Sequence, residues 1–399
     1  MDGPASLHCG GQADDYGDGD RGLGASHLTA LAGELCQVAR EGGLDEVGIA
    51  PAQPFTETRR HLEARKAAGL HGGMHFTYGD PAHATDPARS IPGARSLIVG
   101  ARSYRRTDPA APTRPGPWGK VARYSWSDHY EPLRRALEAV RDRLVADGWA
   151  ARVLVDDNAL VDREAAYRAG LGWYGKNTML LLPGRGSWFV LGSVVTDAPL
   201  PPTASRVADG CGSCCRCLPA CPTAALIAPG VLDARRCLAW LLEAPGPFPK
   251  EYRVALGARL YGCDDCQEAC PPNRGADRHR APPPAAAEDE PWIDVVDLLA
   301  LDDDTLMARV GRWYVPRRQP RYVRRNALVV LGNVGDGSDP RVQACLRRAL
   351  EDRDPLLRAH AVWAAARLGR RDLLYGMLVG EDDDEVRTEL DQAFAPLAR

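Results

Sequence analysis

The sequence lacks any apolar run that approaches the roughly 18 residues needed to span a membrane. Its N-terminal stretch is acidic and glycine-rich, and it lacks the basic and apolar regions of a secretory signal peptide. We therefore expect a cytoplasmic protein with no membrane contact and a disordered leader at residues 1–26. A large excess of one charge is also missing, because the net charge is only −3. Any nucleic-acid site must then be a local basic patch.

Cysteine, by contrast, is abundant and clustered, because nine of the twelve cysteines lie within residues 211–270. The first run has the bacterial ferredoxin spacing Cys-x-x-Cys-x-x-Cys-x-x-x-Cys-Pro and consists of Cys211, Cys214, Cys217 and Cys221. The second run lacks its first ligand and consists of Cys263, Cys266 and Cys270. Cys237 lies between the runs and can supply the missing ligand. Eight thiolates suit two 4Fe-4S clusters.

In two-cluster ferredoxins the last cysteine of each run binds the other cluster, which predicts two ligand sets. The first set is Cys211, Cys214, Cys217 and Cys270. The second set is Cys221, Cys237, Cys263 and Cys266. Two zinc sites are the main alternative, although the Cys-Pro ends of both runs favour clusters. Disulfides are a weaker alternative. Four cysteines stand apart from this scheme: Cys215 is out of register, and Cys9, Cys36 and Cys345 are isolated.

The order of predicted elements divides the chain into parts. Strands predicted at 47–50, 96–101, 151–155 and 187–195 alternate with helical stretches, which indicates an α/β domain at residues 27–205. The cysteine-rich segment at 206–275 has little apolar core of its own, so we expect a ferredoxin-like module held together by its metal. A proline-rich linker is expected at 276–294.

The remaining part, residues 295–399, is predicted to be a helical domain. Two similar stretches at 325–332 and 358–369 each end in Leu-Gly, and these pairs lie 37 residues apart. This spacing is typical of HEAT-like helical repeats.

A glycine-rich stretch resembles two nucleotide-binding motifs without satisfying either. Gly170, Gly172 and Gly175 form a GxGxxG pattern, and Asn177 stands where a P-loop needs Ser or Thr. Both motifs require a strand before the glycines and a helix after them, and here the predicted order is reversed. A helix end followed by a turn is the better interpretation.

Two other features suggest chemistry. Asp162 precedes a helical stretch, where a carboxylate often serves only as a cap or first-turn residue. Residues 312–325 hold six arginines and three aromatics, which can bind phosphates and stack on unpaired bases. A solvated face with ordinary ion pairs is the alternative interpretation of that patch.

Taken together, these residues resemble the epoxyqueuosine reductase family over about residues 27–370. The most specific matches are Ala169–Asn177, the run from Cys211 to Thr223, Asp233–Cys237, Tyr261–Gln267 with Cys270-Pro271, and Arg325–Leu328 with Leu331–Asn333. The resemblance implies reduction of epoxyqueuosine to queuosine at the wobble position of tRNA, in which a cyclopentane epoxide becomes an alkene. It also implies a cobalamin, bound by the α/β domain near one cluster, whose reduced cobalt attacks the epoxide.

The same resemblance assigns roles to particular residues. It makes Asp162 the proton donor. It also implies a set of residues that face the cobalamin: Arg123, Tyr124, Asp162, Gly175, Lys176 and Asn177. We expect the tRNA to meet Arg317, Arg318, Arg321, Tyr322 and Arg325 of the helical domain. An external donor of the flavodoxin or ferredoxin type would supply electrons, and we expect a monomer. Where the family usually has Asp-Tyr-His, this chain has His129-Tyr130-Glu131.

Two other functions would use some of the same cofactors and domains. A reductive dehalogenase-like enzyme would share both cofactors but act on a small organohalide, and it would need no helical-repeat domain. A non-catalytic ferredoxin-type carrier would need neither the long α/β domain nor the arginine-rich patch.

Overall fold

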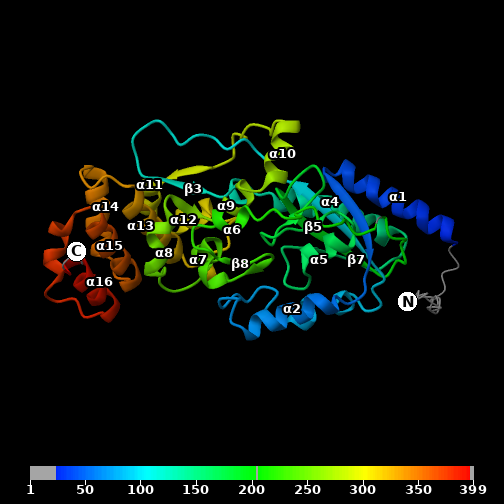
Figure 1. Cartoon of the computed structure of the whole chain (residues 1–399), viewed down its shortest axis with the longest axis horizontal. Coiled ribbons are helices and arrows are strands. Elements are labelled where there is room, and N and C mark those ends of the chain that lie inside the picture. Colours follow the sequence, from blue (N-terminus) through cyan, green and yellow to red (C-terminus); the bar gives the residue numbers. More distant parts are fainter. Residues whose placement is uncertain (1–23, 204, 396–399) are drawn as a thin grey trace, which may run out of the picture.

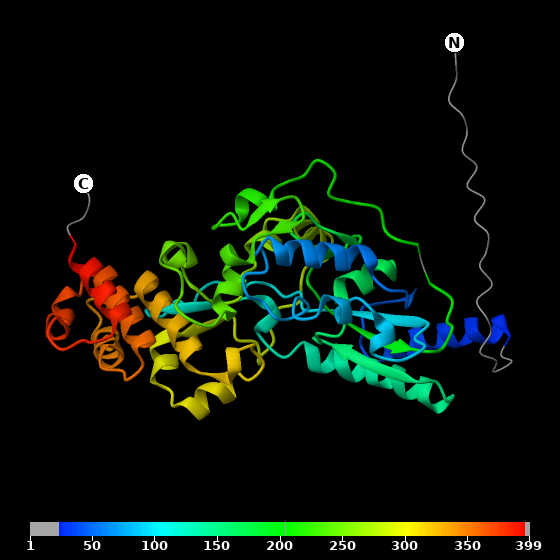
Figure 2. The ribbon, with the colours of Figure 1, turned by 90° about the horizontal axis from the view of Figure 1, so that it is seen from below.

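The computed structural model describes residues 24–203 and 205–395. The molecule is elongated, with a sheet domain at one end of its long axis and helical repeats at the other (Figures 1 and 2). The cysteine-rich segment lies between these ends. Most of the predicted leader falls outside the described residues, and helix α1 begins at Ala25. No helix in the described part is both long and apolar enough to cross a membrane.

A four-stranded sheet forms the core of the N-terminal end, in the order β1-β2-β7-β4. Its strands are β1 (Glu46–Pro51), β2 (Ser96–Ser103), β7 (Phe189–Thr196) and β4 (Ala151–Val155). All three pairings are antiparallel. The predicted strands are therefore present, but their alternation with helices does not produce the parallel sheet that such a pattern usually indicates.

Helices cover both faces of this sheet because successive residues of each strand point to opposite sides. On β2, Ile98 packs into the core formed with α1 (Ala25–Glu41) and α4 (Tyr130–Ala146). Leu97 and Val99 face the other core, which includes α5 (Asp162–Arg168). Shorter elements complete this end: α2 (Thr56–Ala67), α3 (Pro81–Ala84), the 3-10 turn η1 (Pro87–Arg89), and the hairpin of β5 (Trp173–Tyr174) and β6 (Leu180–Leu181).

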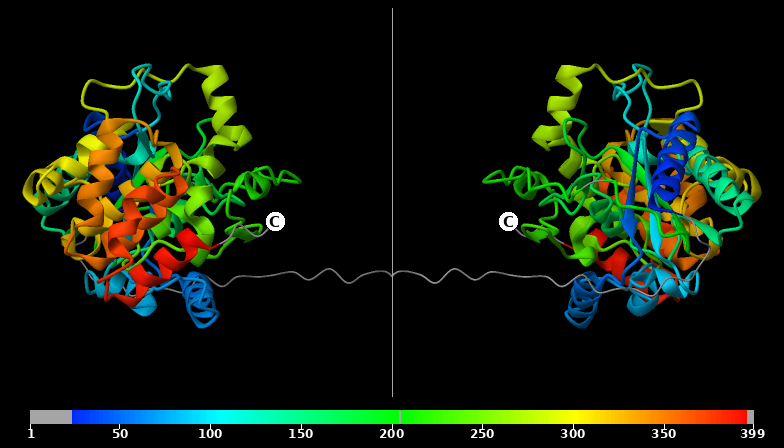
Figure 3. Two further views of the ribbon diagram at one scale, coloured as in Figure 1. Left: turned by 90° about the vertical axis from the view of Figure 1, so that its left-hand side faces the viewer. Right: turned by 90° about the vertical axis from the view of Figure 1, so that its right-hand side faces the viewer.

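A second sheet joins the α/β domain, the cysteine segment and the predicted linker. Strand β3 (Trp118–Val121) pairs with β10 (Arg259–Tyr261) of the cysteine segment and with β11 (Trp292–Asp294), in the order β10-β3-β11. The predicted linker is therefore not a free tether. Helix α10 (Pro271–His279) occupies its start, and β11 occupies its end. Thr107 N–H also donates to the carbonyl of Pro283, so the following residues run beside the loop that precedes β3 (Figures 1 and 3).

The cysteine segment combines short helices with one hairpin. Its elements are α6 (Cys217–Ala220), β8 (Leu226–Ala228), β9 (Val231–Leu232), η3 (Ala234–Arg236), α7 (Leu238–Glu243), α8 (Lys250–Leu256) and α9 (Asp265–Glu268). The expectation that this segment has little core holds only for its first half. Leu238, Leu242, Phe248 and Leu260 are buried in the same hydrophobic cluster as the C-terminal helices. Apolar packing thus contributes to holding this segment, in addition to any metal.

The C-terminal end is a stack of helices. They are α11 (Val295–Ala300), α12 (Asp303–Arg309), α13 (Arg321–Val334), α14 (Pro340–Leu350), α15 (Pro355–Arg367) and α16 (Asp384–Phe394), with the 3-10 turns η4 (Pro316–Arg318) and η5 (Arg371–Met377). Aspartates cap several of these helices, since Asp339 and Asp354 each precede a first-turn proline and accept a hydrogen bond from the backbone N–H of the residue after it. The predicted repeat stretches lie in α13 and α15. Gly332 allows these helices to pack closely, because a Cβ there would come within 2.6 Å of Trp363.

Candidate active site between the sheet domain and the cysteine segment

The structure gathers the eight predicted cluster cysteines into two groups. Burial raises the pKa of Cys270 to about 11, and the neighbouring Cys211, Cys217 and Cys214 raise it further. Burial likewise raises the pKa of Cys266, where Cys237 and Cys221 are the nearest cysteines. Cys263, for its part, lies close to Cys237. Cys270 thus has the other first-set cysteines as electrostatic neighbours, whereas Cys266 has Cys217 as well as Cys237 and Cys221, and the two ligand sets stay a prediction.

The chemistry and spacing of these groups fit clusters better than single ions. Both runs end in Cys-Pro, as bacterial ferredoxin runs do, and eight thiolates match two four-iron clusters. Cys215 is exposed, while Cys36 and Cys345 are buried far from both groups in sequence.

A hairpin tip from the sheet domain reaches both cysteine groups. Lys176 Nζ donates to the carbonyl of Gly212 at 2.6 Å, beside the first group. Asn177 Nδ2 donates to the carbonyl of Cys266 at 3.4 Å, in the second group. Gly175 has no room for a side chain there, because a Cβ would lie 2.2 Å from Leu181. The predicted cofactor segment Gly175-Lys176-Asn177 therefore lies against the proposed clusters.

The other glycines of the GxGxxG pattern also have local structural roles. Gly170 follows the end of α5 with φ +74°. Gly172 packs against β6, where a Cβ would lie 2.2 Å from the carbonyl oxygen of Leu181. The stretch is thus a helix end followed by a tight hairpin, as its interpretation as a turn predicts, and it has no helix start to cradle a phosphate.

Asp162 is the first residue of α5, and the residue before it, Val161, holds the N-cap position without a side-chain hydrogen bond. The half-buried Asp162 carboxyl makes no hydrogen bond or ion pair with any described residue. Burial holds its pKa well above the usual range, and the nearby Asp156 raises it further. A buried, unpaired carboxyl of this kind favours its protonated form and can donate that proton.

Other acidic and phenolic groups surround this carboxyl. Tyr130, from the segment that differs from the family pattern, has a pKa raised by burial and by Asp156, Asp162 and Glu243. Its hydroxyl, like the Asp162 carboxyl, has no hydrogen-bond partner within the described residues. Tyr124 Oη donates to Glu243 Oε1 at 2.8 Å. The region between the sheet domain and α7 is therefore lined by proton-carrying groups.

Nearby His129 is buried, with 3% of its surface exposed, and its ring centroid lies 5.7 Å from that of Tyr104. Burial lowers the pKa of His129 to about 4, so this histidine is neutral at physiological pH. It packs inside the domain and does not join the acidic group.

Unsatisfied polar groups and exposed rings on this side of α5 fit a large, amide-rich cofactor such as cobalamin. The free carboxyl of Asp162 and the free hydroxyl of Tyr130 can take up hydrogen bonds from amide groups. The ring of Tyr174, next to the hairpin tip, is 39% exposed and offers an apolar surface.

The guanidinium of Arg123, in contrast, is taken up by internal contacts. It lies 4.4 Å over the ring of Trp188 and forms ion pairs of 3.5 Å with Asp108 and 3.8 Å with Glu268. The backbone N–H of Arg123 donates to Asp264 at 2.8 Å. These contacts hold the Arg123 side chain in place, while its Nε has no hydrogen-bond partner among the described residues, and a cofactor-facing role for this residue stays a prediction.

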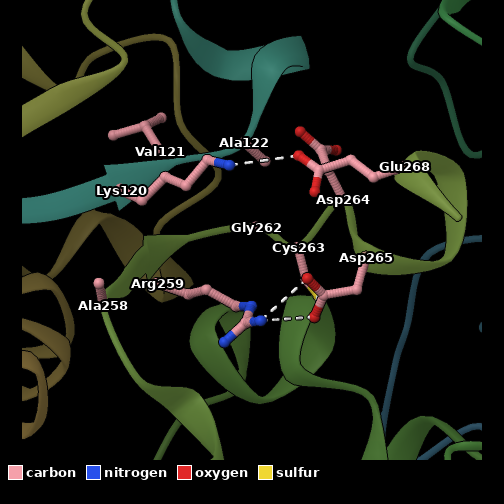
Figure 4. A pocket seen from close by; sticks show the side chains of 10 residues that line it. All are labelled: Lys120, Val121, Ala122, Ala258, Arg259, Gly262, Cys263, Asp264, Asp265 and Glu268. Atoms are coloured by element: carbon pink, nitrogen blue, oxygen red, sulfur yellow. Dashed lines mark hydrogen bonds and ion pairs between the residues drawn. The ribbon is translucent and has the colours of Figure 1, made fainter. Parts of the chain in front are cut away.

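A cavity of about 150 Å³ lies beside the second cysteine group (Figure 4). Its charged groups are paired with one another, since Lys120 reaches Glu268 at 3.2 Å and Arg259 reaches Asp265 at 2.7 Å. Cys263 lines the same cavity. Small-molecule sites typically measure about 300–1,000 Å³, so this space is too small for a corrinoid.

Comparison with known proteins identifies the family. The epoxyqueuosine reductase of Xanthomonas campestris pv. campestris is 36% identical over 348 residues, which cover 86% of this chain and 97% of that protein. The chain belongs to the epoxyqueuosine reductase family. The Bacillus subtilis (strain 168) epoxyqueuosine reductase is 33% identical over 374 residues, covering 91% of this chain and 95% of that one.

A solved structure of an epoxyqueuosine reductase with an epoxyqueuosine-modified tRNA-Tyr stem loop has a TM-score of 0.83 and 31% identity. The match covers 92% of this chain and 98% of that one. Family models match residues 85–157 (epoxyqueuosine reductase QueG, DUF1730), 210–273 (4Fe-4S double cluster binding domain) and 316–395 (HEAT repeats). These matches confirm the predicted iron–sulfur segment and the predicted helical repeats.

For an epoxyqueuosine reductase, the exposure of the arginine-rich stretch decides which residues can meet tRNA. Arg325 is fully buried, and its guanidinium donates to the carbonyls of Leu241, Leu242, Ala244 and Gly246. Tyr322 is only 8% exposed. The predictions that Arg325 and Tyr322 contact tRNA are therefore wrong, because both face the interior and Arg325 holds the end of α7.

The rest of the stretch does reach the surface. Arg317 and Arg318 are exposed in a loop whose φ angles are +51° and +55°. Arg317 forms no hydrogen bond or ion pair with a described residue, whereas Arg318 donates to the carbonyl of Gly311 at 3.1 Å. Arg321 is paired with Asp354 at 2.9 Å. Arg317 and Arg318 thus remain the most available cations of the predicted patch.

Sequence reasoning missed two residues of interest. Glu243 ends the apolar helix α7, and a single acidic residue closing an apolar stretch gave no motif to notice. Tyr314 was seen only as part of the arginine-rich stretch, yet its side chain is 58% exposed beside Arg317. The signals that could have found them are a charged residue at the end of a buried helix and an aromatic residue among arginines.

Proposed function

We propose that this protein reduces epoxyqueuosine in tRNA to queuosine by removing the epoxide oxygen and leaving an alkene. The observation that carries the proposal is the contact of the hairpin tip, through Lys176 and Asn177, with both cysteine groups, in a domain that also holds the unpaired Asp162 carboxyl. Family membership supports the same substrate, because relatives at 36% and 33% identity are epoxyqueuosine reductases.

Two 4Fe-4S clusters would be held by the two cysteine groups, with Cys270 completing the first and Cys221 completing the second. Cobalamin, when bound, supplies the strong nucleophile that opens the epoxide ring. Tyr130, Tyr174 and the hairpin tip of Gly175, Lys176 and Asn177 would hold and orient that cofactor. Electrons would come one at a time from an external donor of the flavodoxin or ferredoxin type.

Asp162 would protonate the epoxide oxygen as its bond to carbon breaks. An alkoxide is a poor leaving group, and a positioned acid typically contributes ~10²–10⁴-fold to such a step. A solved structure of the Bacillus subtilis relative is described as having a catalytic aspartate loop swung out of the active site. That description supports an aspartate as a catalytic group in the family.

The exposed loop of Tyr314, Arg317 and Arg318 would contact the tRNA. Arginines bind phosphates through charge-assisted hydrogen bonds, and an exposed tyrosine can stack on an unpaired base. The solved relative with a bound tRNA stem loop supports direct binding of such a partner. Arg321 would contribute if it exchanged its ion pair with Asp354 for a phosphate.

The direct test uses protein loaded anaerobically with iron and cobalamin, a stem loop carrying epoxyqueuosine, and a low-potential reductant. Nucleoside mass spectrometry should show queuosine appearing with loss of one oxygen. An organohalide incubated in parallel should be left unchanged. Failure to convert the stem loop with both cofactors loaded, or dehalogenation instead, would overturn the proposal.

A further inference from the structure

The pair formed by Tyr124 and Glu243 bridges two parts of the chain. Tyr124 lies in the 3-10 turn η2 (Arg123–Ser125) of the sheet domain, whereas Glu243 is the last residue of α7 in the cysteine segment. Their 2.8 Å hydrogen bond joins residues 119 positions apart. Gly262 makes this approach possible, because a Cβ there would lie 2.8 Å from the Tyr124 ring.

Among the described residues, no cation acts on the Glu243 carboxyl. The groups that face it are Tyr124, Tyr261, Asp156, Tyr130 and Cys237. Burial raises the pKa of Glu243 to about 7, and Asp156 adds to this effect, while the hydrogen bond from the Tyr124 hydroxyl opposes it. The carboxyl is therefore about half protonated at neutral pH, so it can both release and recover a proton.

The proposed reaction needs more protons than Asp162 holds. Converting an epoxide to an alkene and water takes up two electrons and two protons, and both protons go to the same oxygen. The first opens the ring and leaves a hydroxyl group; the second lets that hydroxyl leave as water. The electrons arrive through the clusters from the low-potential donor. Asp162 can donate only one proton before it is reloaded, so a second donor beside the same oxygen would supply the other proton directly.

We propose that Tyr124, backed by Glu243, delivers the second proton, an assignment that rests on the proposed function. When Glu243 is protonated, its hydrogen bond to Tyr124 reverses and frees the phenolic O–H to point into the site. As Tyr124 gives its proton to the departing hydroxyl, Glu243 passes its own proton to the phenolic oxygen. Tyr124 ends neutral, and Glu243 ends as a carboxylate that solvent reloads.

The position of Tyr130 supports one shared site for both donors. Its pKa responds to Asp162 and to Glu243, so it lies near both carboxyls. The two donor systems thus approach the same region from opposite parts of the chain, Asp162 from α5 and Glu243 from α7.

The test compares Glu243→Gln, Tyr124→Phe and the double variant, each loaded with iron and cobalamin, with Glu251→Gln as the matched control. Glu251 is an exposed carboxyl on α8 of the same segment. Turnover of the epoxyqueuosine stem loop is followed from pH 5.5 to 8.5, with metal content and cobalamin absorption recorded for each protein. The wild-type rate should fall as the pH rises through about 7, because Glu243 then loses its proton.

We expect each single variant to slow turnover by ~10²-fold or more and to lose this fall near pH 7. The double variant should be no slower than either single variant, because the two groups act as one unit. Glu251→Gln should match the wild type. An unchanged rate and pH profile in Glu243→Gln, or additive effects of the two changes, would overturn the proposal.

Two further outcomes distinguish failure of this inference from failure of the proposed function. If Glu243→Gln loses iron or cobalamin, Tyr124→Phe decides: full turnover by that variant overturns the proposal, and slow turnover with a flat profile supports it. If the wild type converts no epoxyqueuosine at all, the proposed function fails. If the wild type is active and the variants match its rate and pH profile, only the second-donor assignment fails.

Discussion

Replacing Asp162 with asparagine should slow turnover. It should also raise the stability of the protein relative to the wild type, by a margin that grows as the pH rises. Asparagine keeps the shape of the side chain but cannot donate an acidic proton. The carboxyl has no partner among the described residues, and burial with Asp156 nearby raises its pKa well above the usual range. Folding therefore favours the protonated form, and deprotonation destabilises the folded state.

The two expected effects have different sizes and signs. Loss of a positioned general acid should lower the turnover rate ~10²–10⁴-fold, which corresponds to about 3–5 kcal/mol of activation free energy. For stability, the raised pKa means that the wild type loses stability as the pH climbs above the unfolded carboxyl value of about 3.9. The variant has no such group, so its melting temperature should gain on the wild type between pH 4 and pH 8.

The assay pairs single-turnover conversion of the stem loop with thermal melts across this pH range. Iron content and cobalamin absorption of the variant should equal those of the wild type. A helix cap would behave in the opposite way, because losing a cap costs about 0.5–2 kcal/mol of stability and leaves chemistry intact. Near-normal turnover by a fully loaded Asp162→Asn protein, with a lower melting temperature, would refute the assignment and leave Asp162 as a first-turn residue.

The other predictions concern the metal and the RNA. Cys237→Ser should lower the iron content from about eight to about four atoms, while Cys215→Ser should leave it unchanged; the reverse result would refute the ligand sets. Replacing Arg317 and Arg318 with alanine should weaken stem-loop binding and lower the salt slope by about 1–2, measured by binding titrations at several salt concentrations. Arg325→Ala should instead cost ~3–5 kcal/mol of stability, seen in denaturant melts, because it removes a buried guanidinium and leaves carbonyls unsatisfied.

Local spacing explains what could be predicted from the sequence. Cysteines that bind one cluster must lie at short, regular intervals, so the spacing alone predicts the two ligand sets, including the role of Cys237 between the runs. Strands such as Ser96–Ser103 are likewise visible as apolar runs. Their direction is not, because alternation of strands and helices does not say whether neighbouring strands run parallel or antiparallel.

Burial that depends on distant packing could not be predicted. Arg325 looks like its neighbours in an arginine-rich stretch, yet α13 packs against residues about eighty positions earlier, where its guanidinium meets the carbonyls that follow α7. Glu243 gains its raised pKa from burial among parts of the chain that are distant in sequence, beside Tyr124 and Tyr261. Neither environment leaves a trace in the adjacent sequence.

The sheet of β3, β10 and β11 also governs the order in which the chain can fold during its synthesis. The ribosome makes Trp118–Val121 long before either partner strand exists, so both edges of β3 stay open while the cysteine segment is being translated. Pairings so far apart in sequence form slowly. Since β11 leads directly into α11, closing this sheet also positions the first C-terminal helix. This sheet is thus completed only when the chain has grown almost to its helical repeats, which leaves a long interval in which the earlier part of the chain stays an unfinished fold.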